Sequence, residues 1–125
     1  VISNHMPDIE ETKGIIDEKL LRLLPPSATL INTGRGAQIK ENDLAKVLKV
    51  RPDLTALLDV TMHEPPYPWS SLYRRSNIFI TPHIAGSLSG EINRMIDYAY
   101  SSYLDIINGR AGKGEILINE LKHMA

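Results

Sequence analysis

Cysteine is absent from the 125-residue chain, and no apolar run is long. The lack of cysteine excludes disulfides, thiolate catalysis and zinc sites built on cysteine, and it suits a reducing cytoplasm, where we expect the protein to lie. No apolar stretch approaches the roughly 20 residues that cross a membrane. The formal net charge is only -1 and no basic tract dominates, so the composition gives no case for binding nucleic acid or a membrane.

The composition is otherwise that of an ordinary globular chain. Hydrophobic residues make up 42% and charged residues 23%, which suits one small domain with a single core and argues against disorder throughout. The chain begins with Val1 rather than methionine, and residues 1–3 have the pattern of a strand that is already under way. We therefore expect that residues preceding Val1 are missing and that the chain is a fragment.

Apolar segments of two kinds alternate along the chain. Short continuous apolar runs predict strands at 1–4, 28–33, 54–60 and 77–81. Apolar residues at helical spacing predict helices at 17–24, 42–50 and 89–108, the first capped by Asp17. Continuously apolar strands alternating with helices predict a doubly wound parallel α/β sheet that is covered on both faces.

Polar and charged residues follow each predicted strand. His5 comes after the first strand and Arg35 after the second, Asp59 ends the third with Glu64 close behind, and His83 follows the fourth. In open parallel sheets, ligands bind beyond the carboxyl ends of the strands. A purely structural sheet has no need of this set, so we take these residues as candidates for a functional site.

Four motifs around these residues carry a family resemblance. HMPDIEET, LINTGRGAQI, LLDVTMHEP and ITPHIAG occur in that order, each at a predicted strand end. They resemble the His-x-Pro, Ile-Asn-Thr-x-Arg-Gly, Leu-Asp-Val-x-x-x-Glu-Pro and Thr-Pro-His-x-Ala-Gly motifs of NAD-dependent D-2-hydroxyacid dehydrogenases. The resemblance covers residues 1–108 and implies the C-terminal half of a Rossmann-type NAD-binding domain, followed by a long helix. Residues 109–125 would form a tail that belongs to, or leads back to, the substrate domain.

The resemblance implies an oxidoreductase that transfers a hydride between NAD(H) and a small D-2-hydroxy acid or 2-oxo acid. Arg35 would bind the substrate carboxylate, since its planar fork offers two parallel charged hydrogen bonds. His83 would be the acid and base, and Glu64 would orient the imidazole and favour its protonated form. The family's cofactor contacts match His5, Pro7, Thr12, Thr33, Gly34, Arg35, Asp59, His83, Ala85 and Gly86. No metal site is predicted. His63, which stands beside Glu64, has no family counterpart and is interpreted as a surface residue.

The chain also departs from the family pattern. The Gly-x-Gly-x-x-Gly fingerprint and its downstream acid, which hold the pyrophosphate and the adenosine ribose, do not occur in it. The fragment is therefore expected to be inactive alone, and the sequence decides neither the 2-hydroxy acid nor NAD against NADP. Thr61 replaces a common aromatic residue, and Lys40 stands where the family often begins a helix with aspartate. The full-length protein is expected to be a homodimer. An NAD-sensing, corepressor-like interaction module without turnover remains the alternative.

Overall fold

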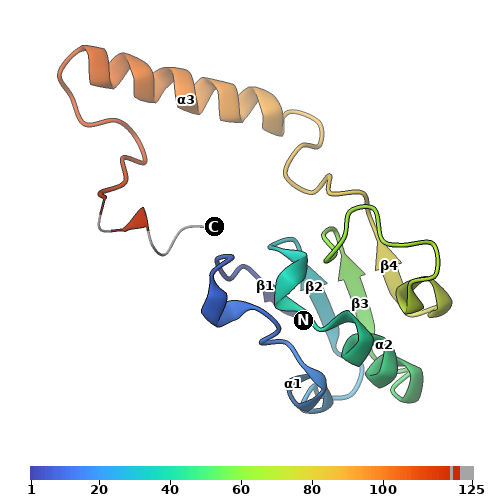
Figure 1. Ribbon diagram of the computed structural model, residues 1–125. Coiled ribbons are helices and arrows are strands. Elements are labelled where there is room, and N and C mark those ends of the chain that lie inside the picture. The colour runs from blue at the N-terminus through green and yellow to red at the C-terminus, as the bar shows by residue number, and fades with distance from the viewer. Residues whose placement is uncertain (119, 122–125) are drawn as a thin grey trace. The chain divides into compact units, whose positions relative to one another are not determined.

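A computed structural model describes residues 1–118, 120 and 121 of the chain (Figure 1). The chain divides after His83 into two compact units, and each unit is described by itself. The first unit is an α/β structure that contains every strand of the described chain. The second, from Ile84 onward, contains one long helix.

The first unit is built on a four-stranded parallel sheet. Its strands are β1 (Ile2–Asn4), β2 (Thr29–Asn32), β3 (Thr55–Leu58) and β4 (Ile78–Ile80), and they lie in this order across the sheet. The last residues of the four strands, Asn4, Asn32, Leu58 and Ile80, are partners in the register. The carboxyl ends are therefore level, and the segments that follow them leave from one edge. The predicted strands and the parallel α/β class are confirmed.

Two helices and three short 3-10 helices connect the strands. They are η1 (Glu10–Thr12), α1 (Glu18–Arg22), η2 (Gly36–Gln38), α2 (Glu41–Val50) and η3 (Ser71–Arg74). Asp17 caps α1 as expected, since its carboxylate accepts a hydrogen bond from the Leu20 N–H at 3.0 Å. That bond lowers the pKa of Asp17 below its usual value. Lys40 occupies the corresponding position of α2 and makes no side-chain cap. The sequence did not predict the 3-10 helices.

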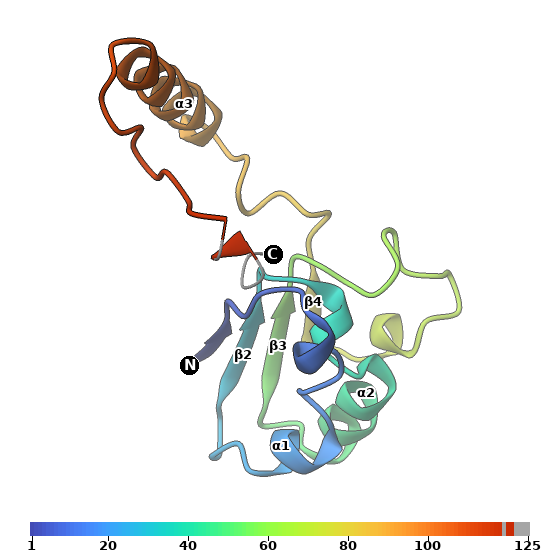
Figure 2. The same ribbon diagram turned by 60° about the vertical axis from the view of Figure 1, so that its left-hand side comes forward.

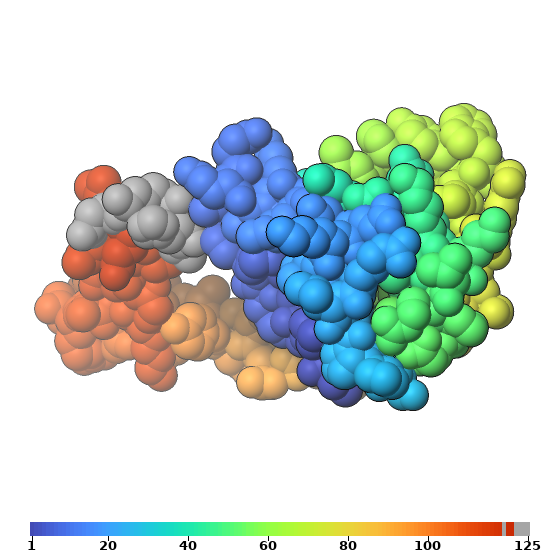
Figure 3. All heavy atoms as spheres, turned by 90° about the horizontal axis from the view of Figure 1, so that it is seen from below, coloured from blue at the N-terminus to red at the C-terminus, as the bar shows by residue number. Residues whose placement is uncertain are grey.

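Both helices pack on the same face of the sheet (Figure 2). In the space-filling view of Figure 3, α1 and α2 lie side by side on the surface of the unit. Leu44 and Val47 of α2 are completely buried against the sheet, together with Leu54 and Leu72. On the opposite face, Leu57 and Phe79 remain exposed.

The exposure of Leu57 and Phe79 differs from the prediction of a sheet that is covered on both faces. Within the first unit, all connections between β1 and β4 cross on the same side of the sheet, so helices cover one face only. Continuously apolar strands thus give the composition of a doubly covered sheet, but they do not say which part of a protein supplies the second layer.

The second unit contains α3 (Glu91–Ile107), which confirms the predicted long helix. Gly109 follows it with a φ of 71°, the left-handed conformation that commonly ends a helix and that glycine adopts without strain. Among the described residues, no helix is long and apolar enough to cross a membrane. The predicted role of the tail at 109–125 falls partly outside the described residues, and it stays a prediction.

Candidate active site

A buried polar network ties together the loops that follow β1 and β2. The Asn4 side-chain amide donates to Asn32 Oδ1 at 2.9 Å and also to Gln38 Oε1. The Gln38 amide donates in turn to the backbone carbonyls of Met6, at 2.7 Å, and of Pro7, at 2.8 Å. All three amide side chains are buried, and burial is tolerated because these bonds satisfy their polar atoms. The network makes the edge of the sheet a fixed frame.

Asn32 also shapes the segment that carries the predicted arginine. Its side-chain oxygen accepts from the Gly34 N–H at 3.2 Å, and its amide donates to the Arg35 carbonyl at 3.1 Å. The Arg35 backbone is thereby held directly beyond the end of β2. Asn4, Asn32 and Gln38 were not among the predicted site residues. A signal was present, because amide side chains that end two apolar strands are costly to bury without partners.

Glu64 and His83 meet although 19 residues separate them in sequence. His83 Nδ1 lies 2.7 Å from Glu64 Oε2. An ionised carboxylate only accepts hydrogen bonds, so the Nδ1 atom carries the proton in this pair. Nε2 is consequently the imidazole atom that remains for a ligand. His83 adopts a positive φ of 55°, which is uncommon for a residue other than glycine, and it follows Pro82 directly beyond β4.

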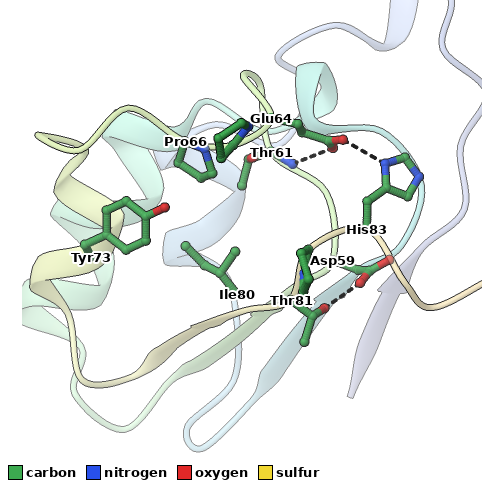
Figure 4. A pocket seen from close by; sticks show the side chains of 10 residues that line it. Asp59, Thr61, Glu64, Pro66, Tyr73, Ile80, Thr81 and His83 are labelled. Atoms are coloured by element: carbon green, nitrogen blue, oxygen red, sulfur yellow. Dashed lines mark hydrogen bonds and ion pairs between the residues drawn. The ribbon is translucent and has the colours of Figure 1, made fainter. Parts of the chain in front are cut away.

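A pocket of about 450 Å³ opens beside this pair (Figure 4). Asp59, Glu64 and His83 contribute ionisable groups to its lining, and Tyr73 and Ile80 contribute apolar surface; Thr61 and Thr81 also line it. Asp59 is buried, at 6% exposure, and its Oδ1 accepts a hydrogen bond from the Thr81 hydroxyl. One side of the pocket can thus hold an apolar or flat group, while the other offers a carboxylate and an imidazole.

Arg35 is exposed at the same edge of the sheet but outside this pocket. Its guanidinium donates to the Gly34 carbonyl at 2.9 Å. Among the described contacts, none joins Arg35 to Glu64 or His83. Arginine only donates hydrogen bonds and is positively charged. An anion is therefore a suitable partner for the other N–H groups of the Arg35 guanidinium.

The remaining predicted residues of the first unit differ in how exposed they are and in whether their polar groups are already hydrogen-bonded. His5 is exposed, with Nε2 2.8 Å from the Ser3 hydroxyl. The Thr12 hydroxyl is already used within its own loop, donating to the Pro7 carbonyl at 2.6 Å. Thr33 is exposed directly beyond β2. Cofactor contact by these residues and by Gly34 stays a prediction.

Two further predicted contacts, Ala85 and Gly86, belong to the second unit and are not placed relative to the site. His63 is exposed, as expected, and its ring lies 4.5 Å from that of Tyr67. Within the part of the chain that the structure describes, no group of three or more histidine, aspartate or glutamate side chains is arranged to hold a metal ion.

The chain is similar to known proteins of one family. Residues 1–85 match the family model of the D-isomer specific 2-hydroxyacid dehydrogenase NAD-binding domain. The chain is 40% identical over 88 residues to YoaD of Bacillus subtilis (strain 168), which bears the name of a 2-hydroxyacid dehydrogenase; the match covers 70% of this chain and 26% of YoaD.

Solved structures agree in fold. D-lactate dehydrogenase with NAD+ from Lactobacillus jensenii matches 93% of this chain and 39% of its own, with a TM-score of 0.76 and 25% identity. The NADPH-dependent glyoxylate/hydroxypyruvate reductase of Sinorhizobium meliloti, in complex with NADP and sulfate, matches 91% of this chain and 37% of its own, with a TM-score of 0.75 and 25% identity. The chain thus spans between a quarter and two fifths of the length of these relatives.

Proposed function

The chain belongs to the D-isomer specific 2-hydroxyacid dehydrogenase family, and on that premise we propose that it supplies the catalytic side of an NAD(P)-dependent oxidoreductase acting on a small D-2-hydroxy acid or its 2-oxo acid. The observation that carries the proposal is the 2.7 Å hydrogen bond between Glu64 and His83 at the edge of the sheet where Asp59 and Arg35 also lie. A dehydrogenase of this chemistry needs an acid and base, a group that binds a carboxylate, and a surface for a flat ring.

In this proposal the nicotinamide ring lies in the pocket beside Glu64 and His83. Its apolar surface, from Ile80 and Tyr73, suits the ring, and the Asp59 carboxylate is an acceptor for a carboxamide N–H. Of the predicted cofactor contacts, Asp59 and His83 line this pocket, whereas Thr33, Gly34 and the loop from His5 would contact the cofactor outside it. When bound, the cofactor accepts or donates the hydride, and the residues of this chain manage the proton and the substrate.

His83 handles the proton through Nε2. In the oxidation direction, the substrate hydroxyl loses its proton to Nε2 as the hydride leaves the same carbon. In the reduction direction, the imidazolium returns a proton from Nε2 to the ketone oxygen. Glu64 makes this role of Nε2 possible. Its carboxylate accepts a hydrogen bond from Nδ1–H, which leaves Nε2 for the substrate, and its negative charge stabilises the imidazolium.

Arg35 would bind the carboxylate that every 2-hydroxy acid carries beside its reacting carbon. Bound there, the substrate is fixed by its common group, whereas the side chain that distinguishes one acid from another lies elsewhere. The chain alone would turn over little or nothing, since its relatives are more than twice as long. A homodimer and a cytoplasmic location are parts of this proposal.

The test is NADH and NADPH oxidation by the full-length protein over a panel of 2-oxo acids, for the wild type and for His83→Gln. Loss of general acid–base catalysis lowers the rate by about 100- to 10,000-fold. His63→Gln is the matched control, because that histidine stands next to Glu64 in sequence but is exposed and packs on Tyr67. Equal turnover by wild type and His83→Gln contradicts the assignment. Tight NADH binding without turnover on any acid would point to the sensing module instead.

A further inference from the structure

The Glu64 side chain is held toward His83 although little packing surrounds it. Its side chain is 40% exposed and that of His83 is 52% exposed, so neither is locked by packing. A free glutamate would sample several rotamers, and holding one of them costs conformational entropy. The second carboxylate oxygen shows what holds it: Oε1 accepts a hydrogen bond from the Thr61 backbone N–H at 3.2 Å (Figure 4).

The backbone from Thr61 to Met62 is itself fixed by two side chains. The buried Thr61 hydroxyl donates to the His63 carbonyl at 2.8 Å, which closes the turn that leads to Glu64. The Met62 N–H donates to Glu41 Oε1 at 2.6 Å, and Glu41 lies in the first turn of α2. This second bond is charge-assisted and ties the turn to a helix of the core.

The same stretch of backbone rests against the arginine loop. A side chain at Gly36 would overlap the Thr61 carbonyl group and the Met62 nitrogen, so the two backbones are in direct contact. The residue after Arg35 therefore touches the turn that carries Glu64. One rigid piece of backbone consequently joins the candidate carboxylate-binding loop to the candidate acid–base pair.

We infer that Thr61 and Glu41 are positioning residues for His83, acting through the backbone at 61–62 and the Glu64 carboxylate. The inference rests on the proposed function for its catalytic consequence, but its structural part does not. Thr61 closes the turn, Glu41 anchors it to α2, and the fixed Thr61 N–H holds Glu64 in the rotamer that keeps the proton on His83 Nδ1. Glu41 does not line the pocket. Thr61 does line it, but its hydroxyl is used by the His63 carbonyl.

The experiment measures which imidazole nitrogen of His83 carries the proton, by 15N NMR of the full-length protein with labelled histidine. The His83 signals are assigned by their absence from His83→Gln. The wild type is expected to show Nδ1 protonated and Nε2 free in the neutral ring. Thr61→Val keeps the shape of the side chain and removes the hydroxyl, and Glu41→Ala removes the anchor. Both should shift the His83 signals toward a mixture of tautomers, whereas Thr61→Ser should restore the wild-type spectrum. Thr55→Val, at the opposite end of β3, is the matched control.

Kinetics of the full-length protein provide a second readout. Losing one such hydrogen bond should lower kcat by about two- to tenfold. For Glu41→Ala the KM for NADH should be unchanged, because Glu41 does not line the pocket. His83 signals in both variants that match those of Thr55→Val would overturn the inference. If Thr61→Val does not fold, Glu41→Ala decides alone, because Glu41 is at the start of a helix and outside the core. Shifted tautomers in a protein without turnover would support the positioning role while refuting the proposed reaction.

Discussion

Replacing Gly36 with alanine tests whether the loop after β2 presses on the turn after β3. Gly36 does not have a positive φ, so an alanine meets no backbone strain and only the space for its methyl group matters. A Cβ at this position would lie 2.5 Å from the Met62 nitrogen and closer still to the carbonyl carbon and oxygen of Thr61. Because these are all backbone atoms, no rotamer change relieves the overlap.

The cost follows from how far the backbone must move. Ordinary contact begins at 3.4 Å, so one of the two segments has to shift by about 1 Å or more. Overpacking of well-packed sites costs about 1–3 kcal/mol, and the rigidity here favours the upper end. The smaller entropy of the unfolded alanine chain offsets about 0.4–1 kcal/mol of this. The free energy of unfolding should therefore fall by about 2 kcal/mol, a large fraction of the stability of a small domain.

Gly34→Ala is the matched control, on the other side of Arg35. A Cβ there would meet Gln38 Oε1 at 3.2 Å, the Asn4 side-chain nitrogen at 3.3 Å and the Asn4 carbonyl oxygen at 3.4 Å, so these neighbours need to move by only a few tenths of an ångström. Its cost should stay below about 1 kcal/mol. Urea denaturation of the three proteins, analysed by linear extrapolation, measures the difference. If Gly36→Ala is as stable as Gly34→Ala, the two backbones do not press on each other and the coupling argued above is wrong.

Two further changes test the frame of the site and a distant ion pair. Asn32→Ala removes a buried hydrogen bond from the Asn4 amide and the bonds that Asn32 makes with the Gly34 N–H and the Arg35 carbonyl. Losing these three bonds should lower the free energy of unfolding by about 2–3 kcal/mol, and a urea midpoint equal to that of the wild type would contradict it. Asp53→Asn should flatten the acid dependence of Tm. The Arg51 guanidinium holds the pKa of Asp53 well below its usual 3.8, so the carboxylate stabilises the fold above that value, and this contribution is lost as the pH falls through the lower pKa of the folded state. The difference in Tm between wild type and variant should shrink below about pH 4, and a difference independent of pH in that range would refute the role of the ion pair.

The common geometry behind these tests is a level sheet edge with loops that support one another. The strand ends are in register, and the buried amides join the first two loops. The Gly36 contact then joins the second loop to the third, and Glu64 joins the third to the fourth through His83. A substitution that breaks any one of these contacts between loops should therefore alter the geometry of the Glu64–His83 pair, although most of the residues concerned are far from it in sequence.

The sequence by itself determined the alternation of strands and helices, because short apolar runs and helical spacing are local patterns that the neighbouring residues decide. It also placed Arg35, Asp59 and His83 at one edge, since residues that follow parallel strands share an edge in any such sheet. Asp17 marked the start of the first helix through local backbone chemistry. These predictions needed no knowledge of which loops touch.

Only the tertiary structure decided which of the candidates meet. The family resemblance had predicted that Glu64 orients His83, but only the fold put the two side chains 2.7 Å apart and left Arg35 without a described contact to either. Loop paths depend on contacts between segments distant in the chain, so local patterns do not give them. Thr61 was a departure from a family pattern in the sequence and a buried, hydrogen-bonded residue in the fold. Gly36 was part of a motif, and its physical reason is the backbone packed against it. A close approach between two backbones leaves no periodic trace in either segment, so it is visible only when both are in place.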